Sequence, residues 1–419
     1  MKNLNSKKIG KSISRLSLLL LAFISSTFTA CENDEDQVAN NGEEAESAWI
    51  RGLVNYTLDG AVWYMDVNES VNETFDISAS VELGADAEVY SVGEHPFTIS
   101  RDSKTITKWK VDKTTMEITV DAIISYATTG LNDVGRVIFF SETQGFLHDL
   151  GEGLILEFNP SSMEISRTHN VPPKPEYDDF SIISFTAFVY NGKIIYPLIN
   201  APIQCCEYNQ QLNATVGVFD PNTGDFGYSI DERGFTVGFE VNVDENNTAY
   251  LGSADVGTFT YKHLNIDTAT FPNHLAIYKL QENGEFDPTF ELNLEEYIPD
   301  ITLFRYSSFV LEDKMAFIYS ALPYEDYGSF DDRWSDRNRN NKSVLLDLNT
   351  GETTQFSSFD NYNDGVIFLR TIGGVNYFSG YRREGEESYS YLLKQNSIDD
   401  YSVISTTTSG GFEHINKLW

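Results

Sequence analysis

Arginine and aromatic side chains gather in two short segments of an otherwise acidic chain. In "DDRWSDRNRNN" (residues 331–341) and "GYRREGEES" (residues 380–388) the basic and aromatic residues are Arg333, Trp334, Arg337, Arg339, Tyr381, Arg382 and Arg383. A guanidinium group donates paired hydrogen bonds to an anion and stacks on aromatic rings. The two segments therefore suit a flat, anionic ligand, unless local salt bridges to Asp331, Asp332 and Asp336 use up the charge of the first.

Two further pairs of residues are candidates for ligand binding. Arg305 and Tyr306 lie in the strand-like segment "ITLFRYSSF" and would face the centre of a closed fold, unless the arginine pairs with a carboxylate there. Tyr261 and Lys262 lie in residues 253–273, a long segment between two apolar strands. All of these residues are candidates for binding a ligand, and none is assigned a catalytic role.

Cysteine and histidine usage gives no indication of a metal site. The adjacent residues Cys205 and Cys206 form either a vicinal disulfide, which would stiffen the backbone locally, or two free thiols. The histidines show no ligand spacing; they are residues 95, 148, 169, 263, 274 and 414. We expect neither a metal nor a cofactor.

Catalytic motifs are also missing from the sequence. There is no Gly-x-Ser-x-Gly elbow, no phosphate-binding glycine loop and no His-Glu-x-x-His zinc motif. The 63 acidic residues could still supply an acid and a base, for example Glu240 and Asp255, so a glycosidase or lyase stays open as an alternative. We expect a protein that is not an enzyme.

The elements that must position these residues are β-strands, arranged in repeats. An apolar strand, a turn rich in Asp, Asn, Pro, Thr and Gly, and a second strand recur at residues 106–120, 154–168, 215–229, 275–292, 343–357 and 390–405. A further strand pair precedes these hairpins, most clearly at 180–199 and 235–252. Four antiparallel strands per unit, repeated in a ring, make a β-propeller. We favour seven blades, and six or eight also fit the sequence.

Ring closure and the placement of long segments follow from this repeat. The last strand, in "GGFEHINKLW", is expected to pair with the opening segment 49–83. The longest insertions fall between the second and third strands of the units, at 141–153, 200–213, 253–273, 321–342 and 380–388. Equivalent loops of a propeller emerge on one face, so this face is the predicted binding surface.

The beginning of the chain reads as an export signal. A basic head and an apolar run of about a dozen residues, too short to span a bilayer, end at "FTAC", residues 28–31. This motif resembles the lipobox of bacterial lipoproteins, which implies cleavage after residue 30 and lipidation of Cys31. We expect a signal peptide at 1–30, an acidic flexible tether at 31–47 and one propeller domain at 48–419.

Charge limits the possible partners. The chain has a net charge of −34, and because residues 1–30 hold five basic and no acidic residues, the processed chain has a net charge of −39. A nucleic-acid partner is excluded, because phosphate binding needs a basic surface. An anionic membrane would repel the domain, so only the lipid would hold it there.

A family resemblance adds an expected function. The segment "LAIYKLQENGEFDPTFELNLEEY" (residues 275–297) is similar to a motif in Bacteroidota β-propeller surface lipoproteins of the siderophore-capture type. The acidic "ENDED" after Cys31 looks like the surface-export signal of lipoproteins from that phylum. The resemblance implies an outer-membrane lipoprotein, facing the cell exterior rather than the periplasm, that captures a ferric siderophore for a TonB-dependent transporter. It identifies no binding residue.

One further class of function stays open from the residues themselves. Aromatic side chains at Tyr324, Tyr327, Trp334 and Tyr381 would also suit adhesion to a glycan or a protein. The sequence therefore predicts a binding propeller and leaves the identity of its ligand undetermined.

Overall fold

Strands dominate the computed structural model. It describes residues 45–57, 60–72, 74–85, 87–132, 134–173, 181–183, 187–201, 213–233, 238–254, 275–290, 292–326, 341–359, 362, 365–384, 387–408 and 410–419. The chain divides into two units, residues 1–43 and 44–419, and all described residues belong to the second. The predicted signal peptide and Cys31 lie outside the described residues.

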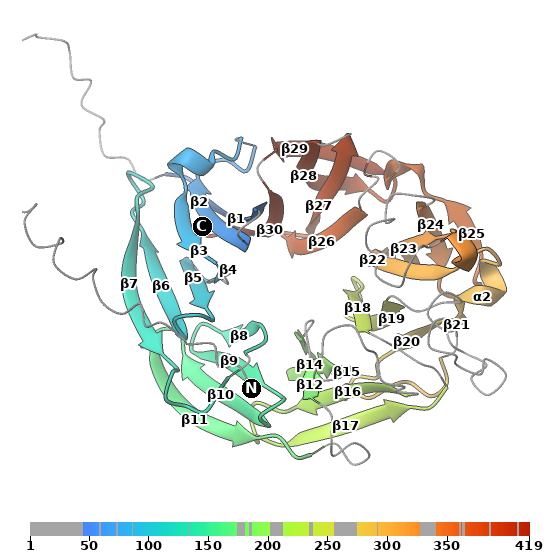
Figure 1. The fold of residues 1–419 in the computed structure, drawn as a ribbon, viewed down its shortest axis with the longest axis horizontal. Coiled ribbons are helices and arrows are strands. Elements are labelled where there is room, and N and C mark those ends of the chain that lie inside the picture. Colours follow the sequence, from blue (N-terminus) through green and yellow to red (C-terminus); the bar gives the residue numbers. More distant parts are fainter. Residues whose placement is uncertain are drawn as a thin grey trace, which may run out of the picture. The chain divides into compact units, whose positions relative to one another are not determined.

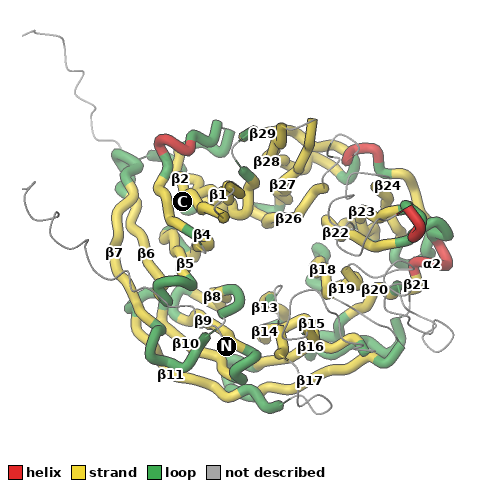
Figure 2. The backbone as a smooth tube through the Cα atoms, in the orientation of Figure 1, coloured by secondary structure: helices red, strands yellow, loops and turns green. Residues whose placement is uncertain are grey.

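Seven four-stranded antiparallel sheets, the blades, stand around a common centre (Figures 1 and 2). We number them in chain order and name their strands A to D from the centre outward. Blade 1 contains β30 (Gly411–Lys417), β1 (Trp49–Thr57), β2 (Gly60–Asn68) and β3 (Val81–Gly84). Blade 2 contains β4 (Ala87–Val92), β5 (His95–Ser100), β6 (Thr105–Val111) and β7 (Ile118–Ser125). Blade 3 contains β8 (Val137–Ser141), β9 (Gln144–Asp149), β10 (Leu154–Asn159) and β11 (Glu164–Asn170).

The remaining four blades keep the same order. Blade 4 contains β13 (Phe188–Tyr190), β14 (Lys193–Pro197), β16 (Ala214–Phe219) and β17 (Phe226–Asp231). Blade 5 contains β18 (Gly238–Val243), β19 (Ala249–Ala254), β20 (Ala276–Lys279) and β21 (Leu292–Asn293). Blade 6 contains β22 (Leu303–Leu311), β23 (Lys314–Ser320), β24 (Asn341–Asp347) and β25 (Thr353–Gln355). Blade 7 contains β26 (Gly365–Ile372), β27 (Val375–Glu384), β28 (Glu387–Ser397) and β29 (Asp400–Thr407).

Small elements complete the described part of the chain. A two-stranded sheet pairs β12 (Ser181–Ile183) with β15 (Ile199–Ala201). The helices are single turns: α2 (Leu294–Tyr297), η1 (Ile77–Ala79), η2 (Tyr324–Asp326) and η3 (Ser357–Phe359). None of the helices formed by the described residues has the length and apolar character needed to cross a bilayer. The prediction of an all-β propeller with seven blades is confirmed.

Burial along the strands explains why the blades pack as a ring. The B strand β23 is buried at six successive positions, as expected for a strand covered on both faces by neighbouring blades. The outermost strand β11 is exposed at all but one position. Apolar layers join consecutive blades: Phe304 of blade 6 stacks on Phe317 and packs in one cluster with Ile277 of blade 5. Burial of these side chains stabilises the ring by roughly 25 cal/mol per Å² of apolar surface.

Turn residues stabilise the C–D hairpins at the positions predicted from the sequence. In the hairpin of β16 and β17, Asp220 accepts a hydrogen bond from the backbone N–H of Asn222, and Gly224 has φ +81°. In the hairpin of β24 and β25, Asp347 accepts hydrogen bonds from two backbone N–H groups and Gly351 has φ +75°. Glycine adopts a positive φ without the steric cost that other residues meet. The six predicted C–D hairpins are confirmed.

The ring closes through pairing of the two ends of the described chain. Strand β30 pairs antiparallel with β1, from Trp49 opposite Lys417 to Val54 opposite Gly411. The expected closure is therefore confirmed, and the segment that looked like a partial blade becomes complete only with β30 at its centre. A sheet edge that would otherwise be unpaired is removed, and the last strand of the chain lines the centre of the ring.

A buried ion pair supports this closure. Arg51 on β1 is fully buried, and its Nε and Nη2 donate hydrogen bonds to the two carboxylate oxygens of Asp66, at 3.0 and 2.5 Å. Its Nη1 donates to Oγ of Ser405 on β29 at 3.3 Å. The ring of Phe75 lies 5.2 Å from the guanidinium carbon. Arg51 thus links blade 1 to blade 7 across the closing interface.

Two of the five predicted insertions are wrong. Residues 141–153 contain strand β9 and two short turns, and residues 380–388 are mostly the ends of β27 and β28, which pair as far as Glu384 opposite Glu387. The charged residues of both segments suggested loops, but backbone pairing extends the strand ladders into them. The segments 200–213, 253–273 and 321–342 do connect B strands to C strands, although most of their residues lie outside the described part of the chain.

We predict that Asp66→Asn destabilises the domain, because it removes the carboxylate charge that pairs with the buried Arg51 guanidinium. Loss of one partner of a buried pair costs roughly 3 kcal/mol or more in the free energy of unfolding, measurable as a lower urea midpoint. The matched control is Lys342→Gln, which removes the half-exposed pair between Lys342 and Asp300. This control should change the free energy of unfolding by less than about 1 kcal/mol. Equal effects of the two substitutions would contradict the closing role of Arg51.

Candidate functional site

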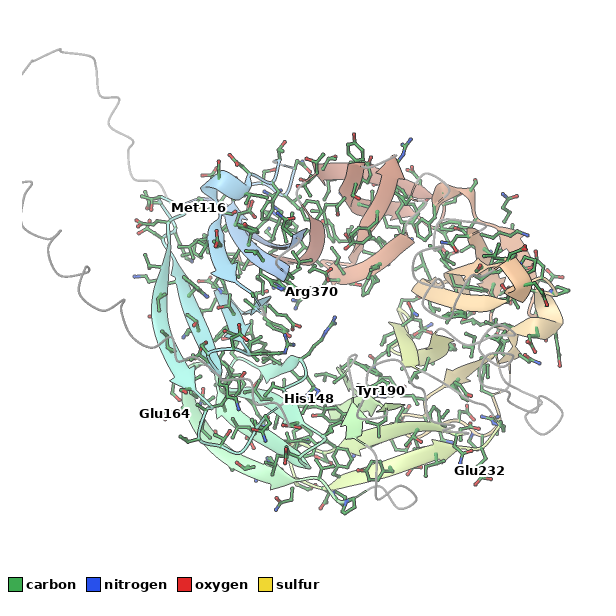
Figure 3. The ribbon with its side chains drawn as sticks, in the orientation of Figure 1. Met116, His148, Glu164, Tyr190, Glu232 and Arg370 are labelled. Carbon is green, nitrogen blue, oxygen red and sulfur yellow. The ribbon has the colours of Figure 1, made fainter. Side chains whose placement is uncertain are left out.

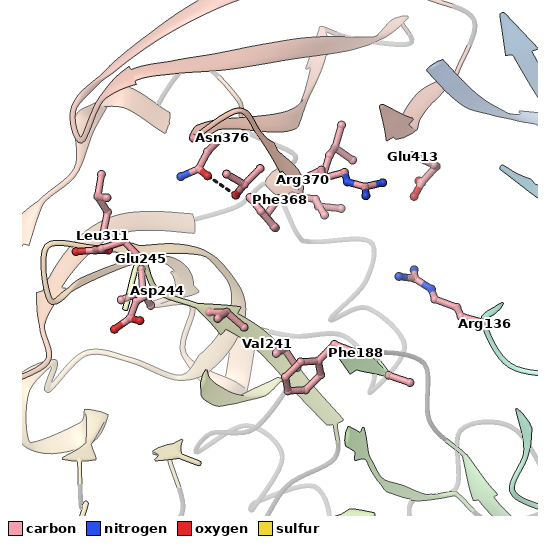
Figure 4. Close-up of a pocket in the computed structure, with 17 residues that line it drawn as sticks. Arg136, Phe188, Val241, Asp244, Glu245, Leu311, Phe368, Arg370, Asn376 and Glu413 are labelled. Carbon is pink, nitrogen blue, oxygen red and sulfur yellow. Dashed lines mark hydrogen bonds between the residues drawn. The ribbon is translucent and has the colours of Figure 1, made fainter. Parts of the chain in front are cut away.

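A cavity of about 920 Å³ lies at the centre of the ring and is lined mainly by the innermost strands (Figure 4). Its lining extends from residues that precede A strands, such as Arg136, to A–B turn residues, such as Glu245 and Gly374. The cavity therefore follows the inner strands along their length. Its volume is in the range of small-molecule sites, about 300–1,000 Å³.

One side of this cavity, from blade 4 to blade 7, is mainly apolar, although Asp244 and Glu245 of the A–B turn of blade 5 also line it. The apolar residues are Phe188 at the start of β13, Val241 and Val243 on β18, Val310 and Leu311 on β22, and Ile367, Phe368 and Leu369 on β26. Ile367 and Phe368 are 38% and 36% exposed, and Val243 is 41% exposed. Side chains of this kind are normally covered, so these blades offer the apolar part of a ligand a surface to bury.

The other side, from blade 7 through blade 1 to blade 3, carries charge. Arg370 extends from β26, Glu413 from β30, and Arg136 from the residue before β8. In Figure 4 the two guanidinium groups and the carboxylate point toward one another, and Figure 3 shows Arg370 beside the centre of the ring. Within the described residues, neither arginine has a hydrogen bond or an ion pair. Two arginines without acceptors are therefore held over one cavity in a strongly acidic protein.

Glu413 has an unusual environment for a carboxyl group. Burial raises its pKa from the ordinary 4.5 to about 7; the charge of Glu88 raises it further, whereas Arg136 and a hydrogen bond from Tyr381 lower it. The hydroxyl group of Tyr381 lies 3.5 Å from Oε1 of Glu413 and donates to the carbonyl of Phe412 at 3.3 Å. Glu413 is therefore close to half-ionised near neutral pH.

A polar network on blades 2 and 3 holds Arg136 in position. Nη2 of Arg101 donates to Oε1 of Glu88 at 2.7 Å, and its Nε donates to the carbonyl of Val134 at 2.8 Å. Tyr90 donates to the other oxygen of Glu88 and accepts from the backbone N–H of Val137 at 3.2 Å. Both Val134 and Val137 flank Arg136 closely in sequence, so the network fixes the backbone that carries it. Burial, followed by the charge of Glu88, raises the pKa of Tyr90.

The residue after Glu413 points into the protein. Nε2 of His414 lies 3.1 Å from Oγ of Ser91. Burial, assisted by the charge of Arg370, lowers the pKa of His414 to about 3. His414 is consequently neutral at physiological pH and adds no positive charge to the cavity.

Most of the binding residues predicted from the sequence lie outside the described residues. They are Tyr261, Lys262, Arg333, Trp334, Arg337 and Arg339; Cys205 and Cys206 also lie there. Arg305 and Tyr306 lie on β22, an innermost strand as expected, but their side chains are not described, and the same holds for the side chain of Arg383 on β27.

Two of the predicted residues can be placed with their side chains. Tyr381 and Arg382 lie on the B strand β27 and not, as predicted, in a loop. Tyr381 is hydrogen-bonded to the inner strand that carries Glu413, so it belongs to the surroundings of the cavity. Tyr381 therefore lies near the cavity, but on a strand and not in the predicted loop.

None of the charged residues that line the cavity was predicted from the sequence, although a signal was available for two of them; they are Arg136, Asp244, Glu245, Arg370 and Glu413. Arg305 was noticed because an arginine interrupts an apolar strand that opens a repeat. The same feature occurs in "VIFLRTI" (residues 366–372) and "GRVIFF" (residues 135–140), and "GGFEHINKLW" carries an acid in the strand that closes the ring. A charged residue within the first strand of a blade can therefore mark the lining of the central cavity; this rule finds Arg370 and Glu413, but not Arg136, which precedes β8.

Neither catalysis nor metal binding follows directly from this arrangement. Among the residues that the structure describes, no group of three or more histidine, cysteine, aspartate or glutamate side chains is placed to hold a metal ion. The arginines can bind carboxylate, phosphate, sulfonate or catecholate oxygens through paired hydrogen bonds. Together with the apolar side, they fit an anion that carries an apolar or aromatic body.

The fold and the cavity place this chain in the class of seven-bladed β-propellers with a ligand-sized central cavity. No family model and no curated protein matches the chain in the comparisons made. Several solved structures are similar at low identity. Apo AztD from Citrobacter koseri has a TM-score of 0.40 and 11% identity, covering 88% of this chain and 98% of that chain.

Two other solved structures are similar to the same degree. Hydrazine synthase from Kuenenia stuttgartiensis has a TM-score of 0.44 and 9% identity, covering 73% of this chain and 76% of that chain. A protein from Lactobacillus plantarum has a TM-score of 0.45 and 12% identity, covering 89% of this chain and all of that chain (100%). Similarities at this level carry no information about the ligand of this protein.

We predict that Glu413→Gln changes how stability depends on pH. Because the folded-state pKa of Glu413 is raised to about 7, its stabilising contribution is complete below the ordinary pKa of 4.5 and is lost as the pH rises through 7. Relative to wild type, the variant should therefore gain roughly 2 kcal/mol in free energy of unfolding between pH 5 and pH 8.

Urea midpoints at the two pH values measure this difference. Glu117→Gln, at an exposed turn position, is the matched control and should follow the wild type at both pH values. His414 titrates with the opposite sign, but it is present in all three proteins and cancels. A constant difference between Glu413→Gln and wild type from pH 5 to pH 8 would show that Glu413 is ionised normally.

Proposed function

We propose that this protein is a binding propeller that captures an anionic, partly aromatic small molecule in its central cavity. The observation that carries the proposal is the pair Arg136 and Arg370, which face the same cavity and lack acceptors among the described residues. Both side chains are exposed to the cavity, so their charges are available to an anion that enters it, and charge-assisted hydrogen bonds from a guanidinium group are stronger than neutral ones.

An iron chelate of the catecholate type is the ligand that we propose within this class. Ferric catecholates combine several negatively charged oxygens with flat aromatic rings, which match the arginines and the apolar side of the cavity. The overall negative charge of the protein opposes an anion only at long range, because salt screens interactions beyond about 8 Å at physiological ionic strength. At short range, attraction to the two nearby guanidinium groups determines the affinity of the cavity for the anion.

We further propose that the chain is a surface lipoprotein of the outer membrane, anchored through Cys31, and that it passes its ligand to a TonB-dependent transporter. This part of the proposal is supported by the resemblance of residues 28–31 to a lipobox and of residues 275–297 to a motif of siderophore-capturing propellers. The A–B turns are shorter than the B–C segments of blades 4 to 6, and this difference in length between the two kinds of connection suits a protein that accepts ligand at one end and docks a partner at the other.

Binding is tested by titrating the purified protein with ferric 2,3-dihydroxybenzoate while tryptophan fluorescence is followed. Wild type should be quenched at micromolar ligand. Arg136→Gln and Arg370→Gln should each weaken binding by roughly ten- to a hundredfold, since a charge-assisted hydrogen bond contributes about 1.5–3 kcal/mol. Lys110→Gln removes the same charge from the exposed surface of β6 and should bind like wild type. No quenching of wild type, or equal quenching of all four proteins, would reject the proposed site.

Anchoring is tested by Cys31→Ala. If Cys31 carries the lipid, the substitution should move most of the protein from the membrane fraction to the soluble fraction of its cells, because the lipid anchor is lost and anionic headgroups repel the acidic domain. Wild-type protein extracted from intact membranes should copurify with a transporter barrel. Membrane association that survives Cys31→Ala would contradict the lipid anchor.

A further inference from the structure

We propose that the central cavity takes up its anionic ligand together with one proton, which is bound by the carboxylate of Glu413. This inference rests on the proposed function and specifies the chemistry of the same site. It makes the affinity for anions higher in mildly acidic than in mildly alkaline solution. It also explains how a cavity that contains its own carboxylate can accept a second anion.

The geometry creates a competition for the same donors. The carboxylate of Glu413 and the guanidinium groups of Arg136 and Arg370 converge on one region of the cavity (Figure 4). Among the described residues, no ion pair joins Glu413 to either arginine. An anion that binds both arginines would come to lie beside Glu413, and two negative charges at close range repel each other. Protonation of the carboxylate removes this repulsion and leaves an O–H group that can donate to the ligand.

Several of the elements packed around Glu413 supply titratable or charged groups. The titratable and charged groups facing it are Arg370 from β26, Tyr381 from β27, Glu88 and Tyr90 from β4, and Arg136 from the start of β8. On β1, Arg51 forms an ion pair with Asp66. On β28, Ser390, which does not titrate, accepts the backbone N–H of Phe412. The two nearest cations are thus those that the ligand would engage.

The protonation state of Glu413 is poised for this role. Burial raises its pKa to about 7, so the proton is only half bound in the free protein near neutral pH. In the free protein, the positive charge of Arg136 lowers the pKa of Glu413. A bound ligand shares this positive charge and adds a negative charge of its own. Both changes raise the pKa further, so the proton moves from solvent to a carboxylate oxygen of Glu413 as the ligand binds. No other bond is made or broken.

The test uses naphthalene-2-sulfonate, an aromatic anion whose charge is constant across neutral pH. Its affinity for wild type, measured by calorimetry, should fall about tenfold between pH 6 and pH 8, as expected for a carboxyl group with a pKa near 7. Titrations at pH 7.5 in triethanolamine and in Tris, two cationic buffers that differ in ionisation enthalpy and do not compete for an anion site, should show net proton uptake. Glu413→Gln should bind with an affinity that is constant within about twofold, and without proton uptake. Glu413→Asp, which keeps an ionisable group, should retain a pH dependence.

The outcomes separate this inference from the function on which it rests. Glu117→Gln is the control and should keep the tenfold change of wild type. A wild-type affinity that is equal at pH 6 and pH 8, a Glu413→Gln variant that keeps the tenfold change, or no binding of the sulfonate would each overturn proton-linked binding. In these cases quenching by ferric 2,3-dihydroxybenzoate that depends on Arg136 and Arg370 would still support the proposed function. Loss of that quenching as well would overturn both.

Discussion

Pairing of the last strand with the first is the constraint on which the rest of this structure depends. Strand β30 forms the innermost strand of blade 1, next to β1, and the chain is thereby closed into a ring. Without it, blade 1 would present an unpaired inner edge, and the apolar layers on either side would lose a partner. The buried pair of Arg51 and Asp66 stabilises the same interface from within the sheet. Closure therefore combines backbone pairing, apolar packing and one satisfied ion pair.

The closing strand also contributes to the site. Glu413 belongs to β30, so the carboxyl group of the central cavity is in place only when the ring is closed. Arg370 comes from blade 7 and Arg136 from the start of blade 3, on either side of this strand. A ligand that engages both arginines would connect blades on both sides of the closing interface. Ligand binding should accordingly stabilise the closed ring, because it favours the folded state alone.

The architecture could be predicted from the sequence because the same strand–turn–strand pattern recurs in successive blades. Turn residues such as Asp220 and Gly224 fix the hairpins by local backbone chemistry, and the apolar alternation of the strands fixes which faces are buried. A segment such as residues 275–292 was placed as a C–D hairpin by the same logic, and the structure confirms it. Local rules of this kind need no knowledge of distant contacts.

The site was less accessible to such rules. Arg333 and its neighbours attracted attention because they are close together in sequence, whereas Arg136, Arg370 and Glu413 are more than two hundred residues apart at the extremes and meet only through the ring. Tyr381 and Arg382 looked like loop residues because their segment is rich in charge, yet cross-strand pairing extends β27 and β28 through it. Contacts made by closure cannot be read from spacing along the chain.

The placement of a ligand in the cavity is tested most directly by a crystal structure with bound ferric 2,3-dihydroxybenzoate, in which the anomalous signal of iron locates the complex without bias from the protein phases. We predict an iron position in the central cavity, with ligand oxygens facing Arg136 and Arg370 and a ring against Phe188 or Phe368. Iron bound over the B–C segments, for example near residues 321–342, with none in the cavity would contradict this account.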